Sequence, residues 1–338
     1  MPSLRRIPRV RPSRPSRRRE RPSKGARAIV VGDLALDVVL APARPTETGT
    51  DVPGRVSIRT GGSAANTARW LARLGVRTQL IGAVGRDGPG RALVEALRAD
   101  GVTPRVGRVG GLRTARIGVL VDPGGERSFV ADRGAADALT PGDLKSGWFA
   151  GVQVVHLPAY SLLGQPLGLA GREAIRLARS VGALVSLDLA SSGPLLADGP
   201  AAALDLVRSA APDLLFATAS ELHALLGSGG RTDARAMGLA PIVVIKRGAA
   251  GVTVLARDDA GRGRVDGSSV KFDVATRPLA AVDTTGAGDA FDAGFIAEWL
   301  ASRAVGRSPL VALRRAAVVG NRIAARQVAA PRRELQLG

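Results

Sequence analysis

The chain has no cysteine and few histidines or aromatic residues, and these absences exclude several kinds of protein. Without cysteine, neither a disulfide framework nor a cysteine-based zinc site can form. The two histidines, His156 and His223, leave little from which to build a histidine metal site. Aromatic residues make up 3% of the sequence, so the chain offers few rings on which nucleic-acid bases could stack.

Long hydrophobic runs are also missing. No apolar run reaches the roughly 18–20 residues that a membrane span needs, and the N-terminus lacks the apolar middle region of a secretory signal. We therefore expect a cytoplasmic protein that does not enter a membrane. The length of 338 residues suits one large α/β domain or two small ones, with enough chain for a sizeable core.

The positive charge is concentrated at the N-terminus. Residues 1–27 contain ten arginines, one lysine and one glutamate, so this segment carries +10 of the net charge of +19. Because the segment has many Arg, Pro and Ser but almost no apolar residues, we predict a disordered tail. It could bind polyanions as a salt-sensitive arm, or it could be a dispensable extension. We expect no other contact with nucleic acid.

From residue 28 onward the pattern favours an α/β fold, because short β-branched runs alternate with amphipathic helical segments. Buried strands separated by helices imply a mostly parallel sheet. Two hairpin-like regions in the first third of the chain break this rhythm, so we predict a small second sheet there. The predicted main strands are 28–31, 77–85, 152–157, 184–188, 213–216 and 242–246, and an antiparallel pair lies within 250–274. The predicted principal helices are 63–74, which lies between Gly62 and Gly75, and 88–101, 167–181, 201–210, 289–303 and 309–328.

The segment "DTTGAGDAF" places an acid directly behind glycines where a helix begins. Gly286 and Gly288 allow the backbone to approach a ligand closely, and the first N–H groups of the helix face outward with a partial positive charge. Such a turn suits a phosphate, and the ionised Asp289 beside it could accept a proton from an attacking hydroxyl. Asp283 and Thr285 offer oxygen ligands for a cation. The alternative is an ordinary glycine turn with Asp as a helix cap.

A second glycine motif, "GGSAANTARWLARLG", lies far upstream. It places Asn66 one turn into a helix behind Gly61 and Gly62, where a short amide and exposed backbone can hydrogen-bond a polyol. Asp37 in "GDLALD" adds a carboxylate that suits paired hydroxyls. Together these residues predict a site for a hydroxylated ligand.

With both motifs in this order and spacing, residues 28–331 resemble the ribokinase-like (PfkB) carbohydrate and nucleoside kinases. The supporting segments are "GDLALD", "GAVGRDGPG", "RTARIGVLVDPGGERSF", "DRGAADAL" and "KRGAAG". The resemblance implies a three-layer α/β/α ribokinase-like fold with a mostly parallel central sheet and a small β-sheet lid. It implies a kinase domain over 28–338, with lid segments at about 36–60 and 112–131.

The resemblance also implies the roles of individual residues in transfer of the ATP γ-phosphoryl group. Asp289 matches the catalytic base, and the anion hole matches Gly286, Ala287 and Gly288. The implied substrate-binding residues are Asp37, Gly61, Gly62 and Asn66, and the implied nucleotide-binding residues are Lys246, Gly248, Gly251 and Asn321. Glu221 matches a residue of the Mg²⁺ water shell, while Asp283 and Thr285 match positions that hold a monovalent cation such as K⁺.

Three departures from the family pattern affect these roles. Thr218 stands where the Asn of an Asn-x-x-Glu motif is usual. Lys246 replaces a threonine and could meet a nucleotide phosphate or be a solvated strand end. After Asn321 the chain has "VAAPRR" where a Gly-Ala pair often helps to hold the cation, which puts potassium dependence in doubt.

We therefore expect an ATP- and Mg²⁺-dependent kinase that acts on a hydroxyl of a ribose- or fructose-type sugar, with Asp289 as the base. The alternatives are an adenosine-type nucleoside kinase, or a non-catalytic sugar-sensing regulator on the same scaffold. A homodimer through the lid is a further option. His156 is expected to be structural, Tyr160 either lines the sugar pocket or packs, and Asp188 either faces the cleft or caps the next turn.

Overall fold

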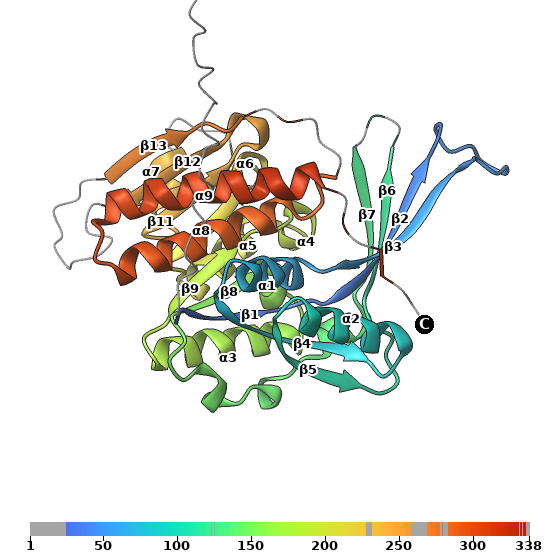
Figure 1. Cartoon of the computed structure of the whole chain (residues 1–338), viewed down its shortest axis with the longest axis horizontal. Coiled ribbons are helices and arrows are strands. Elements are labelled where there is room, and N and C mark those ends of the chain that lie inside the picture. Colours follow the sequence, from blue (N-terminus) through green and yellow to red (C-terminus); the bar gives the residue numbers. More distant parts are fainter. Residues whose placement is uncertain are drawn as a thin grey trace, which may run out of the picture.

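The computed structural model describes residues 25–122, 124, 126–227, 232–257, 269–277, 279, 283–330, 332 and 334–335. Residues 1–24, which make up most of the predicted tail, and residues 258–268 of the predicted antiparallel pair lie outside these ranges. Within them the chain builds a nine-stranded sheet and a separate four-stranded sheet (Figure 1).

The large sheet forms the centre of the molecule. Its order is β13-β12-β11-β10-β9-β8-β1-β4-β5, and the seven strands from β11 to β5 are parallel, as the sequence predicts. The hairpin β12–β13 adds the antiparallel edge. The strands are β1 (Arg27–Val31), β4 (Arg77–Gly85), β5 (Thr103–Val109), β8 (Val154–Pro158), β9 (Leu184–Asp188), β10 (Leu214–Thr218), β11 (Ile242–Lys246), β12 (Val252–Arg257) and β13 (Ser269–Val274).

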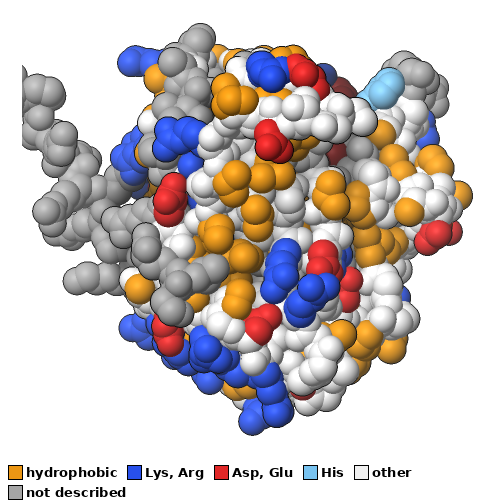
Figure 2. All heavy atoms as spheres, turned by 90° about the vertical axis from the view of Figure 1, so that its right-hand side faces the viewer, with side chains coloured by type: hydrophobic (Ala, Val, Ile, Leu, Met, Phe, Trp, Pro, Cys, Tyr) orange, Lys and Arg blue, Asp and Glu red, His pale blue; other side chains and the backbone are white. Residues whose placement is uncertain are grey.

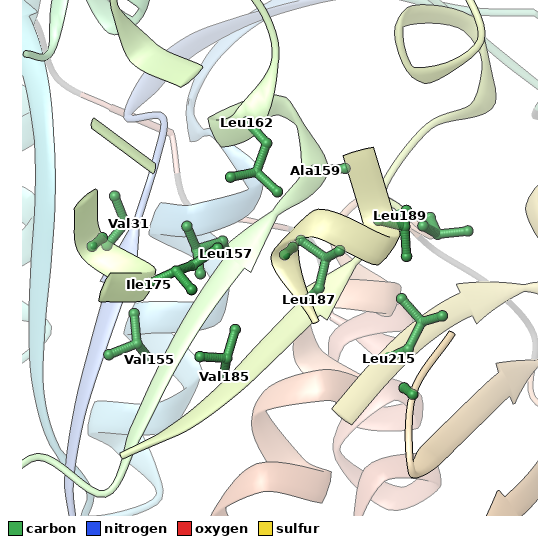
Figure 3. Packing of buried hydrophobic residues seen from close by; sticks show 14 of the residues in the cluster. Val31, Val155, Leu157, Ala159, Leu162, Ile175, Val185, Leu187, Leu189 and Leu215 are labelled. Atoms are coloured by element: carbon green, nitrogen blue, oxygen red, sulfur yellow. The ribbon is translucent and has the colours of Figure 1, made fainter. Parts of the chain in front are cut away.

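Helices cover both faces of this sheet because its central strands are apolar on both faces. In β1, Ile29 and Val31 point into one cluster with α3, α5, α6 and α7, whereas Ala28 and Val30 point into another with α1, α2, α8 and α9. Figure 3 shows part of the first cluster, where Val31, Val155 and Ile175 lie together. The helices are α1 (Ser63–Arg73), α2 (Gly88–Ala99), α3 (Leu167–Ser180), α4 (Ser192–Leu195), α5 (Gly199–Ala210), α6 (Ala219–Leu226), α7 (Thr232–Met237), α8 (Ala287–Ala304) and α9 (Pro309–Ala329).

The small sheet projects from one side of the body (Figure 1). It has the order β3-β2-β6-β7, with β2 parallel to β6 and both outer pairs antiparallel. Its strands are β2 (Ala35–Pro42), β3 (Gly54–Gly61), β6 (Arg116–Val121) and β7 (Arg127–Asp132). Figure 2 looks onto this side of the molecule, where apolar side chains are spread over the face and basic ones gather mainly along one edge.

Strand β5 is the strand that the sequence pattern missed, and the short helices α4 and α7 were not predicted either. Pro104 and Gly107 of β5 are unfavourable in the interior of a sheet, but β5 lies at the edge beside β4, where a missing N–H is tolerated. None of the helices within the described ranges combines the length and apolar character of a membrane span.

Candidate active site

The candidate site lies where the parallel strands end. The chain runs from β1 to β4 on one side of the sheet and continues through β8 on the other side of β1, so the strand order reverses at β1. Ligands of open α/β sheets bind at such a point, beyond the carboxyl ends of the strands. A cavity of about 600 Å³ opens here, and its lining includes Asp33 after β1, Asp188 at the end of β9 and Lys246 at the end of β11.

Asp289 is held by the upstream glycine motif. It lies in the first turn of α8, and its two carboxylate oxygens accept hydrogen bonds from Ser63 Oγ at 2.6 Å and Asn66 Nδ2 at 2.9 Å. Both donors come from α1, more than 220 residues earlier in the chain. The two glycine motifs therefore converge on one carboxylate.

The surroundings of Asp289 shift its proton affinity. Burial raises the pKa of this carboxyl to about 7, although the hydrogen bonds from Ser63 and Asn66 oppose the shift. A carboxylate with a pKa near neutrality is suited to take a proton from a hydroxyl and release it later.

The turn before α8 requires glycine. Gly286 is the N-cap residue and has a φ of 74°, in the left-handed region. A Cβ on Gly286 would lie 3.3 Å from Asn66 Nδ2, and a Cβ on Gly288 would lie 3.4 Å from Lys246 Nζ. The open backbone of Gly286, Ala287 and Gly288 thus lines the cavity beside both Asp289 and a buried ammonium group.

Lys246 forms a buried ion-pair cluster instead of ending in solvent. Its Nζ lies 2.9 Å from Asp188 Oδ1 and 3.2 Å from each carboxylate oxygen of Asp292. Burial would lower the pKa of this ammonium, but Asp188 and Asp292 raise it above its usual range, so Lys246 is charged. The interpretation of Lys246 as a solvated strand end is therefore wrong, whereas its place next to Gly288, in the turn that is predicted to form the anion hole, is compatible with an interaction with phosphate.

Glu221 and Thr218 cap α6 reciprocally. Thr218 Oγ1 accepts from the Glu221 N–H at 3.1 Å, and the Glu221 carboxylate accepts from the Thr218 N–H at 2.7 Å. Thr218 is therefore the N-cap residue of α6, a position at which Asn is also favourable. Both residues line the cavity, and burial raises the pKa of Glu221 above its usual value.

A second cavity of about 330 Å³ adjoins the first. Its lining includes all four predicted nucleotide-binding residues, Lys246, Gly248, Gly251 and Asn321. Asn321 Nδ2 donates to the Val274 carbonyl at 3.1 Å. The two cavities share five lining residues at the end of β10, the end of β11 and the anion-hole turn, namely Thr218, Lys246, Thr284, Ala287 and Gly288. Two ligands would therefore meet at this turn.

Asp37, on strand β2 of the small sheet, also lines the first cavity. Its side chain fits over Gly61, where a Cβ would overlap Oδ1 at 1.8 Å. Arg332 Nη1 donates to Asp37 Oδ2 at 2.5 Å, and burial, opposed by this guanidinium, raises the pKa of Asp37. Gly62 has a φ of 92° at the start of α1. The four predicted substrate residues thus lie together along β2, β3 and α1.

Asp283 does not fit its predicted part in a potassium site. Arg59 Nη1 at 3.0 Å and Arg332 Nε at 3.2 Å contact its Oδ2, while Arg127 Nη2 at 3.2 Å and the Thr285 N–H at 2.9 Å contact its Oδ1. Burial would raise the pKa of Asp283, but the Thr285 N–H and Arg332 lower it below its usual value. Both oxygens are engaged by cationic groups, which disfavour a metal cation at the same place.

The sequence reasoning missed several residues of this site. Ser63 stands one turn before Asn66 and Asp292 one turn after Asp289, so helical spacing could have identified both. Arg59 and Arg127 had no local signal, because their partner Asp283 lies 224 and 156 residues away. Arg332 belongs to the "VAAPRR" segment that departs from the family pattern.

The remaining polar and aromatic candidates are His156, Tyr160 and Asp188. His156 is fully buried with Nδ1 2.9 Å from Ser186 Oγ, and burial lowers its pKa to about 4, so it is a neutral structural residue. Tyr160 and Asp188 both line the first cavity. Among the described residues, no group of three or more acidic or histidine side chains could hold a metal ion.

Comparisons with known proteins agree with this geometry. A match to the pfkB family of carbohydrate kinases covers residues 26–331. The ATP-dependent ribose-1-phosphate kinase of Halopiger xanaduensis is 35% identical over 300 residues, which are 83% of this chain and 88% of that protein. Probable fructokinase-4 of Arabidopsis thaliana is 30% identical over 296 residues, 84% of this chain and 86% of that protein.

A solved structure supports the fold. The adenosine kinase from Sinorhizobium meliloti matches with a TM-score of 0.76 at 25% identity, over 93% of this chain and 97% of that chain. The predicted α/β/α architecture is thereby confirmed. The chain belongs to the pfkB family of carbohydrate kinases, which are phosphotransferases with an alcohol group as acceptor.

Proposed function

We propose that this kinase transfers the γ-phosphoryl group of ATP to a hydroxyl of a small ribose- or fructose-type sugar, with Asp289 as the base. The observation that carries this proposal is the meeting of the two cavities at the anion-hole turn, with Asp289 lining the larger cavity next to that turn. The sugar occupies the larger cavity between Asp37 and Asp289, and the nucleotide occupies the smaller one.

Each residue has a defined task in this reaction. Asp37 and Asn66 hold the hydroxyls of the acceptor and present one of them to Asp289. Asp289 accepts the proton of that hydroxyl as its oxygen attacks the γ-phosphorus. The N–H groups of the turn and the ammonium of Lys246 stabilise the negative charge of the transferred group.

The residues at the junction fit a hydrated Mg²⁺ that arrives with ATP. Magnesium keeps several of its waters and needs few protein carboxylates. Glu221, which lines the larger cavity, would accept hydrogen bonds from such waters. When bound, Mg²⁺ would neutralise part of the phosphate charge. The arginines around Asp283 do not fit K⁺, so we propose that the reaction does not require potassium.

The small sheet is proposed to be a lid. Arg127 on β7 and Arg59 on β3 tie it to Asp283 next to the anion hole, and closure of the lid would exclude water and suppress hydrolysis of ATP. Its strands also expose Val56 and Val130, which are 70% and 77% accessible. These apolar side chains support a homodimer through the lid.

A nucleoside is the second candidate acceptor. Phe129 on β7 lines the larger cavity although 57% of its surface is exposed, and its ring offers a stacking surface for a base. The resemblance to an adenosine kinase structure agrees with this option.

A coupled assay tests both proposals. The purified full chain is given ATP, Mg²⁺ and a panel containing ribose, ribose 1-phosphate, fructose, adenosine and sugar acids. Turnover of a pentose or hexose supports the first proposal, and preferential turnover of adenosine favours the second. No turnover of any acceptor by a protein that binds ATP would favour a non-catalytic regulator.

A further inference from the structure

A third cavity, of about 450 Å³, lies on the other side of α1 from the acceptor cavity, between α1, the end of α2, the end of α9 and the C-terminal segment. Its lining has four arginines and two acidic residues: Arg69, Arg73, Arg326, Arg332, Asp100 and Glu334. It is separate from the nucleotide cavity and has no part in the proposed transfer of the phosphoryl group.

Two guanidinium groups in this cavity are buried and incompletely paired. Arg69 is 4% exposed, and none of its three side-chain nitrogens makes a hydrogen bond within the described part of the chain. Asp100 Oδ2 lies 3.3 Å from its Nε as an ion pair, but Asp100 is shared with Arg73. The Arg332 side chain is 9% exposed, and its buried Nη2 also lacks a hydrogen-bond partner among the described residues.

Burial of its charge is the main electrostatic cost at Arg69. Burial lowers the pKa of this guanidinium to about 10, whereas Asp100 and Asp37 oppose the shift and outweigh the repulsion from Arg73 and Arg332. A buried donor without an acceptor destabilises the protein, and more so when the donor is charged. An anion that accepts hydrogen bonds from both guanidinium groups would relieve both costs.

We propose that this cavity is a regulatory binding site for a phosphate group, held between Arg69 and Arg332. The tetrahedral oxygens of phosphate suit two guanidinium groups that approach from different elements. The cavity is roomier than a single phosphate ion needs, so the group can be free phosphate or part of a phosphorylated metabolite.

The site has two direct connections to the chemistry. Asn66, which holds Asp289, also lines this cavity, and Gln327 in its wall donates to the Thr285 carbonyl at 3.0 Å in the turn before α8. Arg332 itself holds Asp37. An anion that fixes Arg332 therefore changes how Asp37 is presented to the acceptor, and we expect it to act on the KM of the acceptor.

Calorimetric titration tests the site. Inorganic phosphate, sulfate and glycerol 3-phosphate are titrated into the full chain saturated with Mg²⁺ and a non-hydrolysable ATP analogue, which blocks the anion hole. We expect one phosphate to bind, and both Arg69→Gln and Arg332→Gln to weaken binding by about tenfold or more. Arg176→Gln, an exposed arginine on α3 paired with Glu173, is the charge-matched control and should leave binding unchanged.

Three outcomes would overturn this proposal. The first is that none of the three anions binds, and the second is that Arg69→Gln leaves their binding intact. The third is that phosphate alters the KM of the acceptor equally in the wild type and in Arg69→Gln. Tighter binding of glycerol 3-phosphate than of phosphate identifies a phosphorylated metabolite as the natural ligand, and the reverse order identifies free phosphate. If the variants do not fold, the test is a crystal structure of the wild-type protein soaked in phosphate. Electron density for phosphate between Arg69 and Arg332 would support the site, and its absence would refute it.

Discussion

Arg332 holds Asp37 and Asp283 at the same time. Its Nη1 lies 2.5 Å from Asp37 Oδ2, and its Nε lies 3.2 Å from Asp283 Oδ2. One guanidinium group thereby links the carboxylate proposed to bind the acceptor with the carboxylate next to the anion hole. Because Arg59 and Arg127 of the small sheet contact the same Asp283, the link extends to the proposed lid.

Replacement of Arg332 should weaken binding of the acceptor. Without the guanidinium, the buried Asp37 would protonate more readily and accept hydrogen bonds from sugar hydroxyls less well. For Arg332→Gln we expect the KM of the acceptor to rise roughly tenfold or more with a smaller change in kcat. Arg332→Lys should not restore the KM, because one ammonium group cannot bridge both carboxylates. Steady-state kinetics test this prediction by measuring the KM of the acceptor. Arg208→Gln, a change at an exposed arginine, is the control.

Potassium should not be required for activity. The three guanidinium groups around Asp283 supply the positive charge there, and they repel a further cation. Rates with K⁺, Na⁺ or tetramethylammonium at equal ionic strength should agree within about twofold. A thermal melt gives a second readout, in which K⁺ should stabilise the protein no more than Na⁺ does. Strong and selective activation by K⁺ would refute this interpretation of Asp283.

Asp289→Asn should abolish most of the turnover while the protein still binds its ligands. The amide cannot accept a proton from the hydroxyl, so we expect kcat to fall by about 10²–10⁴. Binding of the ATP analogue, measured by calorimetry, should change little. Asp205→Asn on α5, an exposed aspartate, is the matched control. Turnover that is unchanged in Asp289→Asn would refute the assignment of Asp289 as the base.

The activity should also depend on pH through Asp289. Since burial raises its pKa from 3.8 to about 7, the carboxyl is protonated and inactive as a base below that pH. The kcat/KM of the acceptor should therefore rise with pH and level off above about 7. The raised pKa also means that protonation favours the folded state, a contribution that is lost as the pH rises from about 4 to 7. A profile that is flat from about pH 5 to about pH 8 would contradict the assignment.

Removal of Lys246 should destabilise the whole domain. Lys246→Met leaves Asp188 and Asp292, whose side chains are 4% and 0% exposed, without their shared cation. Breaking a buried ion pair from one side costs about 3–5 kcal/mol of unfolding free energy. Urea denaturation measures this loss, and adding Asp292→Asn to Lys246→Met should recover part of it. A single variant as stable as the wild type would show that water reaches these carboxylates.

Local sequence signals predicted most of the elements. The alternation of β-branched runs with amphipathic segments indicated the parallel sheet, and the glycines before α1 and α8 indicated where two functional helices begin. Strand β5 was missed because Pro104 and Gly107 weaken its local pattern, whereas pairing with β4 at the sheet edge compensates for them.

By itself the sequence determined the α/β architecture, the two glycine motifs and the acid at the start of α8, because these depend on residues close together in the chain. Only the tertiary structure decided which partners the charged groups have. Asp283 looked like a ligand for a cation until Arg59 and Arg127 of the small sheet and Arg332 of the C-terminal segment converged on it. Lys246 looked like a strand end until α8 brought Asp292 over it. Burial makes such pairs obligatory, and burial is a property of the folded chain that no local pattern encodes.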